Sequence, residues 1–167
     1  MTAPLRVPIS PSRGITHLRR RSGVAHLSFA PPAPGSQTLS EVFGSLSRAG
    51  INVFFIKKSP TEVGLGVDSA RGEEAEHILR EAGVEAKVQS DCSVACVVAS
   101  NMRDVAGVMH RIVRALNRAG VRLLSTSDSF NSVSCLVSST DLEQAIKALG
   151  EEFGIQESPV PGLLDPW

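Results

Sequence analysis

A six-residue segment that occurs twice constrains the fold of this chain more than any other feature. Leu46-Ser-Arg-Ala-Gly50-Ile51 returns as Leu116-Asn-Arg-Ala-Gly120-Val121, a shift of 70 positions (116 − 46 = 70). In each copy a glycine follows an amphipathic helical pattern and precedes an apolar run, which predicts a helix end followed by a strand. The same shift aligns further apolar positions: Phe43 with Val113, Val53 with Leu123, Val63 with Val133 and Leu79 with Leu149. The chain therefore reads as a duplicated module of about 70 residues.

The periodicity of apolar residues predicts the same order of elements in both copies. In the first copy we expect strands over 24–29, 51–56, 62–67 and 84–88, and helices over 38–49 and 73–82. In the second copy we expect strands over 93–99, 121–125, 132–137 and 155–157, and helices over 105–119 and 141–153. The order βαββαβ is typical of the ferredoxin-like class of α+β folds, with antiparallel sheets and both helices on one face. The other face of each sheet is apolar and uncovered, which predicts association into a dimer.

The repeat also divides the chain. We expect a flexible N-terminal tail over 1–13, a first module over 14–90, a second module over 91–157 and a C-terminal tail over 158–167. Prolines recur in both tails, which favours irregular structure. The cluster Arg19-Arg20-Arg21 is interpreted as a solvated turn, with an anion site as the alternative.

Composition excludes several classes of function. Seventeen basic residues balance seventeen acidic ones and only 4% of the residues are aromatic, so we expect no nucleic-acid partner. No apolar run approaches the roughly 18 to 20 residues of a membrane span, so we expect no membrane partner. Three cysteines and four scattered histidines show no metal-ligand spacing, and the thiols are expected to be buried as small apolar groups in a cytoplasmic protein. No catalytic motif stands out, and we expect neither a cofactor nor a metal.

Several segments resemble a known family. Gly107–Gly120 is similar to the first helix of an ACT module in the regulatory part of aspartate kinases, and Leu123-Leu-Ser-Thr-Ser-Asp128 resembles the strand that follows it. Val133–Val137 and Asp141–Leu149 fit the closing strand and helix, and Gly14–His17 resembles the strand that leads into a tandem pair. The resemblance covers about residues 14–156 and contains no amino-acid kinase domain. It implies a regulatory chain that is not an enzyme by itself: a natural subunit, a truncated form or an independent ACT protein.

The resemblance also implies where an effector binds, namely between modules, at the loop after the first strand and at the second strand. The family loop reads Asp-x-Pro-Gly, and this chain has Asp104-Val-Ala-Gly107. A helix N-terminus presents free N–H groups to a carboxylate, Gly107 permits close approach, and Asp104 is the candidate acceptor for the ammonium group. The alternative is that Asp104 only caps the helix and Gly107 only packs. The remaining candidates of the second module are Ala106, Val108, Arg122, Leu123, Ser125, Ser127 and Asp128.

The first module departs further from the family pattern. Pro34 stands where the aspartate is usual, and Ser36-Gln37 replaces Pro-Gly, so this site is expected to be altered or lost. Lys58 aligns with a family position that is usually Gln, and Arg122 aligns with an Asn that opens the second strand. Both changes add positive charge, which favours an acidic effector or partner carboxylate; solvent-exposed strand ends are the alternative. The hydroxyls of Ser125 and Ser127 either contact an effector or satisfy edge-strand backbone.

Two functions follow from the resemblance. The first is an amino-acid-sensing allosteric module whose effector is lysine, threonine or diaminopimelate, acting as a homodimer on a separate kinase catalytic subunit. The second is a scaffold without a small ligand, in which the ACT modules serve dimerisation or partner binding.

Overall fold

The repeated glycines end their helices as the sequence predicts. Gly50 and Gly120 have φ values of 69° and 70°. The N–H groups of Ile51 and Val121 donate to the carbonyl oxygens of Leu46 and Leu116, each at 2.9 Å. This left-handed conformation is accessible to glycine without strain, so both helices stop at the same place in the repeat. The computed structural model describes residues 14–100 and 106–158.

The described chain forms six strands and four α-helices, with two short 3-10 turns. The helices follow the predicted order, but the two strands expected over 84–88 and 93–99 are one continuous strand, β4 (Lys87–Ser100). The first copy comprises β1 (Gly14–Phe29), α1 (Thr38–Arg48), β2 (Phe55–Lys58), β3 (Val63–Asp68), η1 (Ser69–Arg71) and α2 (Gly72–Glu81). The second comprises β4 (Lys87–Ser100), α3 (Val108–Arg118), β5 (Ser125–Asp128), β6 (Ser132–Ser138), η3 (Ser139–Asp141) and α4 (Leu142–Phe153). The predicted α+β class with antiparallel strands is therefore confirmed.

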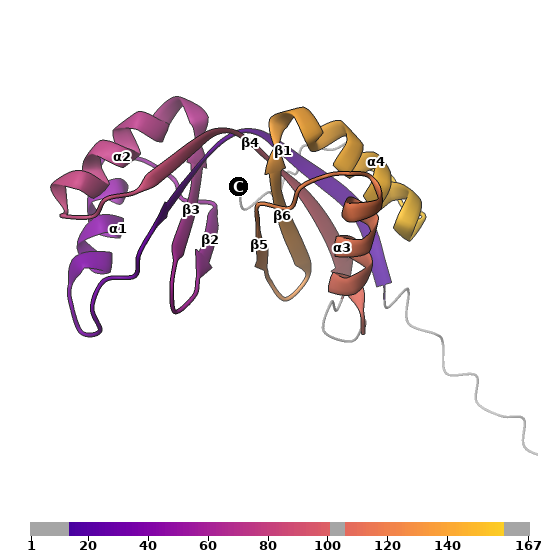
Figure 1. Cartoon of the computed structure of the whole chain (residues 1–167), viewed down its shortest axis with the longest axis horizontal. Helices are drawn as coiled ribbons and strands as arrows, with labels where there is room; N and C mark the ends of the chain where they lie inside the picture. Colours follow the sequence, from indigo (N-terminus) through magenta and orange to yellow (C-terminus); the bar gives the residue numbers. More distant parts are fainter. Residues whose placement is uncertain (1–13, 101–105, 159–167) are drawn as a thin grey trace, which may run out of the picture.

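The strands form one sheet rather than two. Its order is β2-β3-β1-β4-β6-β5, and all the pairs are antiparallel. The long strands β1 and β4 run through both halves of an arch, with α1 and α2 outside one half and α3 and α4 outside the other (Figure 1). Register shifts lie between Arg21 and Val24 in β1, and Gly23 there has a φ of 68°. The sheet bends at this irregular point, so one continuous sheet serves two modules.

The two copies exchange their outer strands. In the first half of the molecule, residues 24–28 of β1 pair with 87–92 of β4; in the second half, residues 14–21 of β1 pair with 94–100 of β4. Residues 14–21 and 84–91 are related by the repeat (14 + 70 = 84), so each copy completes the sheet of the other. The predicted boundary between residues 90 and 91 falls within β4, and the division into two modules stays a prediction. The predicted tails 1–13 and 159–167 lie outside the described residues.

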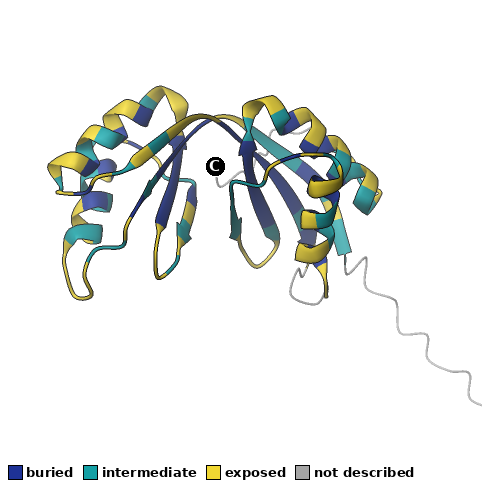
Figure 2. Cartoon of the chain, in the orientation of Figure 1, coloured by how far each residue is buried: buried dark blue, intermediate teal, exposed yellow. Residues whose placement is uncertain are grey.

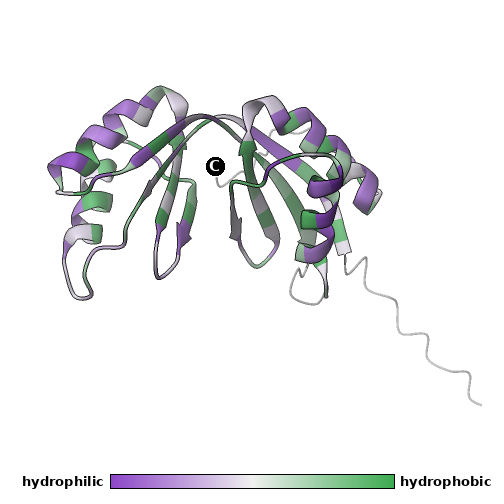
Figure 3. Cartoon of the chain, viewed as in Figure 1, coloured by the Kyte–Doolittle hydropathy of each residue, from purple (hydrophilic) through white to green (hydrophobic). Residues whose placement is uncertain are grey.

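Each half has its own core between sheet and helices. In the first half, Leu27, Leu65 and Leu79 are fully buried, and in the second half Leu18, Ile112 and Leu149 hold the matching layer. Figure 2 shows the buried residues on the strands and on the sheet-facing side of each helix, and Figure 3 shows that apolar residues follow the same pattern. The amphipathic stripes seen in the sequence therefore point where periodicity places them.

A third core joins the halves across the concave side of the arch. It contains Val24, Phe55, Cys92, Val94, Cys96 and Leu136, which come from β1, β2, β4 and β6. Arg21 stacks over the ring of Phe54 at 3.7 Å, and the Ser127 hydroxyl of β5 donates to the Ile56 carbonyl of β2 at 2.9 Å. The apolar sheet face that the sequence left uncovered is thus shared between the two halves of one chain. Dimerisation stays a prediction that needs another surface.

Some predicted boundaries are wrong, each for a local reason. The strands expected from Ile51 and Val121 begin at Phe55 and Ser125, because the apolar residues before them enter the core from a connection; Ile51 and Val121 are 5% and 3% exposed. The segment Arg19–Arg21 is not a turn but part of β1. The strand expected over 155–157 is a single bridge between Leu18 and Glu157.

Candidate functional site

The start of α3 is the best-formed part of the predicted effector site. Gly107 precedes the helix with a φ of 80°, and the side chain it lacks would meet nothing within 4 Å. Ala106 and Gly107 are exposed, whereas Val108 is buried and anchors the first turn. Within the described residues no side chain caps this turn, so its N–H groups can donate hydrogen bonds to an anionic group. Asp104 lies outside the described residues.

The equivalent start of α1 has a similar shape. Gly35 has a φ of 81°, and Ser36 and Gln37 are exposed. Gln37 occupies the N-cap position without a side-chain hydrogen bond, and its carbonyl accepts the Glu41 N–H at 2.9 Å. Among the residues that the structure describes, neither helix start has a side-chain cap. The first half lacks a carboxylate in this loop, since Pro34 stands where the second copy has Asp104.

Four predicted residues are brought onto the two edge strands that face each other across the arch. Lys58 ends β2, while Ser125, Ser127 and Asp128 lie in β5. The Ser127–Ile56 hydrogen bond is a direct polar link between these strands. The hydroxyl of Ser127 thus satisfies edge-strand backbone here, one of the two roles expected of it. We call the contact between β2 and β5 the seam.

Arg122 and Leu123 do not lie near the helix start. They follow the far end of α3, whose 11 residues span about 16 Å. Leu123 packs against the core of the second half, and Arg122 is exposed. The chain then returns along β5, whose C-terminal end points toward the same end of the arch as the starts of α1 and α3 (Figure 1). The predicted residues therefore form two helix starts and a seam rather than one compact pocket.

Sequence reasoning missed an exposed apolar flank on α3. Met109 and Val113 are 40% and 36% exposed and lie one turn apart on the same side of the helix. The signal was present, because these two residues extend the buried stripe of Val108, Ile112 and Leu116 beyond the width that one core can cover.

The described residues offer little for other chemistry. All three cysteines are buried and free, as predicted, and burial raises the pKa of Cys92 to about 11 and that of Cys135 to about 12. Thiols held this strongly protonated are poor nucleophiles and poor metal ligands. No group of three or more metal-binding side chains gathers within residues 14–100 and 106–158. None of the helices in that part of the chain is long and apolar enough to cross a bilayer.

Comparisons with known proteins agree with this architecture. Residues 95–153 match the model of an ACT domain family. Aspartokinase 1 of Bacillus subtilis is 31% identical over 142 residues, which cover 81% of this chain and 35% of that protein. The chain thus spans about a third of the length of this curated relative.

Two solved structures show the same fold. The regulatory subunit of aspartate kinase from Thermus flavus superposes with a TM-score of 0.75 at 19% identity, covering 84% of this chain and 99% of the subunit. Aspartokinase III of E. coli, in complex with lysine and aspartate, superposes with a TM-score of 0.66 at 22% identity, covering 83% of this chain and 33% of that one. The resemblance to the regulatory region of aspartate kinase is confirmed.

Proposed function

We propose that this chain is an amino-acid-binding allosteric regulator that serves as the feedback-sensing part of an aspartate kinase. The observation that carries the proposal is the start of α3 at Gly107, which no side chain of the described residues caps, in a chain whose residues 95–153 match an ACT domain family. A solved relative with this fold is described as a complex with lysine. We infer an effector from the aspartate family of amino acids: lysine, threonine or diaminopimelate.

The binding chemistry follows from the helix start. The free N–H groups of α3 receive the α-carboxylate of the effector, where the helix dipole favours negative charge. Asp104 supplies the carboxylate for the ammonium group, and Ser125 and Asp128 are polar contacts on the neighbouring strand. In the first half, which has no counterpart of Asp104, binding is weaker or absent. Lys58 and Arg122 then set which effector side chain or partner carboxylate is accepted.

A dimer completes the proposal. Met109 and Val113 expose an apolar flank beside the helix start, and a second copy that covers this flank would also place its own groups near Gly107. An effector bound at such an interface favours one arrangement of the two chains. That arrangement holds a separate kinase catalytic subunit in its inhibited state by a population shift.

The test is a thermal melting screen with lysine, threonine and diaminopimelate, run beside a measurement of molecular mass in solution. A ligand that binds only the folded state raises the melting temperature as its concentration rises. Asp104→Ala should abolish this shift and leave the mass unchanged. Asp141→Ala, a carboxylate before α4, is the matched control and should retain the shift.

A ligand-free scaffold is the alternative outcome of the same screen. A stable dimer whose melting temperature responds to none of the three amino acids would reject the effector proposal and leave the scaffold. A shift that survives in Asp104→Ala would remove Asp104 from the site while retaining the function.

A further inference from the structure

Part of β1 has an open edge. Residues 24–29 pair with β3 on one side, but residues 14–21 pair only with β4 among the six strands. A row of unpaired N–H and C=O groups on a sheet edge can add a strand from another chain. Proteins usually cover or charge such an edge.

Residues that follow α4 cover this one. Gly154 ends the helix with a φ of 65°, and Ile155 packs against the core of the second half. The Leu18 N–H then donates to the Gln156 carbonyl at 3.1 Å, and the Ser158 N–H donates to the Leu18 carbonyl at 2.9 Å. The segment therefore runs parallel to β1 and is attached to it by these two backbone hydrogen bonds.

The repeat explains why this attachment is slight. Residues 155–158 align with 85–88 (155 − 70 = 85), and Lys87 and Val88 pair directly with Ser28 and Leu27 of β1. In the second half the corresponding place beside β4 is already filled by residues 14–21 of β1. The segment therefore lies beside β1 instead of β4, and it pairs with only a short stretch of β1 around Leu18.

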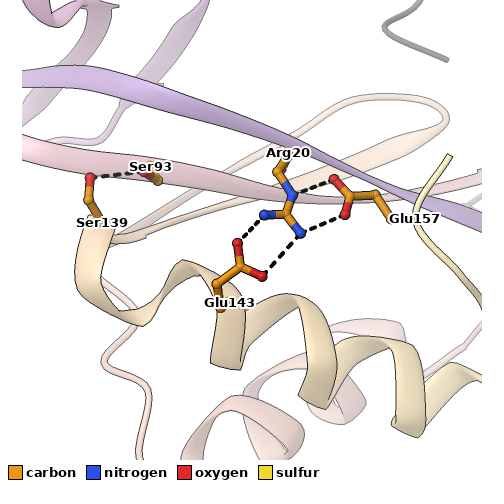
Figure 4. Close-up of polar contacts among 5 residues, drawn as sticks. All are labelled: Arg20, Ser93, Ser139, Glu143 and Glu157. Carbon is orange, nitrogen blue, oxygen red and sulfur yellow. Dashed lines mark hydrogen bonds and ion pairs between the residues drawn. The ribbon is translucent and has the colours of Figure 1, made fainter. Parts of the chain in front are cut away.

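Ion pairs add to the two backbone hydrogen bonds that attach the segment to β1. The guanidinium of Arg20 lies between two carboxylates, one from the segment and one from α4 (Figure 4). Its Nε donates to Oε1 of Glu157, and its Nη2 donates to Oε2 of Glu157 at 2.6 Å. Its Nη1 donates to Oε1 of Glu143. The side chains of Arg20 and Glu157 are 32% and 30% exposed, so this bidentate pair is partly shielded from solvent. Glu143 is 80% exposed and contributes less.

We propose that residues Ile155–Ser158 form a releasable strap over the open edge of β1, with Arg20 as its lock. When the lock is broken, the strap detaches locally and the sheet beneath it stays folded. The detached state exposes the backbone of residues 14–21, a strand-accepting surface that carries the basic cluster Arg19–Arg21.

The experiment is amide hydrogen exchange on the full chain. In Arg20→Gln, the amides of Leu18 and Ser158 should exchange at least about tenfold faster. This factor corresponds to a decrease of about 1.4 kcal/mol in the free energy of local opening of the strap. The amide of Ala99 on β4 donates to the Asn131 carbonyl at 2.8 Å. It reports on opening of the second half away from the strap, and its exchange rate should not change. Glu157→Gln tests the same lock from the strap, in case Arg20→Gln folds poorly.

Arg21→Gln is the matched control. It removes the same charge from the same cluster, but Arg21 contacts Asp68 and Phe54 rather than the strap. The proposal is overturned if Leu18 exchanges within about twofold of wild type in both lock variants. It is equally overturned if Arg21→Gln accelerates Leu18 as much, or if Ala99 accelerates together with Leu18.

Discussion

A buried histidine should make the stability of this protein fall sharply in mild acid. His26 is 8% exposed, and its ring meets the Phe55 ring edge-on, with centroids 6.1 Å apart. A Cβ at residue 64 would lie 2.7 Å from its Nε2, so the imidazole fits here only because residue 64 is glycine. Among the described residues Nε2 has no hydrogen-bond partner. A proton at this atom would therefore be buried without compensation.

The sign of the effect follows from the direction of the shift. Burial lowers the pKa of His26 from its usual 6.5, and nearby Glu62 opposes the shift more weakly. Above pH 6.5 both folded and unfolded chains hold neutral imidazole, so the stabilisation is complete. Below it, the unfolded chain binds a proton that the folded chain excludes. The free energy of unfolding then falls by up to about 1.4 kcal/mol per pH unit until the folded His26 also titrates.

The assay is urea unfolding, followed by circular dichroism, at half-unit steps between pH 7.5 and 5.0. This window lies above the usual carboxylate range, so the lowered pKa values of Glu74 and Glu152, each beside arginine, do not contribute. His26→Cys copies the equivalent residue of the second half, Cys96 (26 + 70 = 96), which accepts a hydrogen bond from Ser134. It should be less stable at pH 7.5 but lose most of the pH slope.

Two histidine controls complete the experiment. His17→Gln should retain most of the slope, since its pKa is lowered by burial and Arg19 at a more exposed site. His110→Gln removes an exposed histidine from α3 and controls for the loss of an imidazole elsewhere in the chain. A His26→Cys protein that loses as much stability between pH 7 and 5 as wild type would refute the reasoning.

Three further predictions test the packing. Leu149→Ala removes a fully buried side chain of the second core and should cost about 2–5 kcal/mol in urea unfolding; a loss below 1 would contradict the core assignment. Gly66→Ala places a Cβ 2.7 Å from the Cβ of Phe55 and should destabilise by about 1–3 kcal/mol, whereas Gly44→Ala in α1 should stabilise by about 0.5–1, measured by the same unfolding curves. Met109→Glu should lower the mass of the proposed dimer in light scattering while changing unfolding by less than about 0.5 kcal/mol, and an unchanged mass would exclude the α3 flank as the interface.

The sequence predicted the local features well. The shift of 70 positions, the glycines after α1 and α3, and the apolar stripes of the helices are all encoded within a few residues. The class of fold and the family resemblance followed from them. The buried thiols were also predictable, because alternation along β4 places Cys92 and Cys96 on one apolar face.

Strand boundaries were less predictable. An apolar residue such as Ile51 or Val121 is buried equally well in a strand or in a connection that enters the core, so periodicity cannot separate the two. For the candidate site, the helix was predicted from residue 105, whereas the described helix begins at Val108, after Gly107. The sequence did not reveal that Arg122 would follow the opposite end of α3.

The tertiary structure alone decided how the two copies are joined. The backbone groups that pair strands are nearly the same for every residue type. The sequence of residues 14–21 therefore does not show that they pair with β4 of the other copy. The same holds for the meeting of Ile56 and Ser127 at the seam, and for the placement of Arg20 between Glu143 and Glu157. Helix ends and amphipathic faces arise from neighbours in the chain, whereas sheet order depends on which distant strand pairs with each edge.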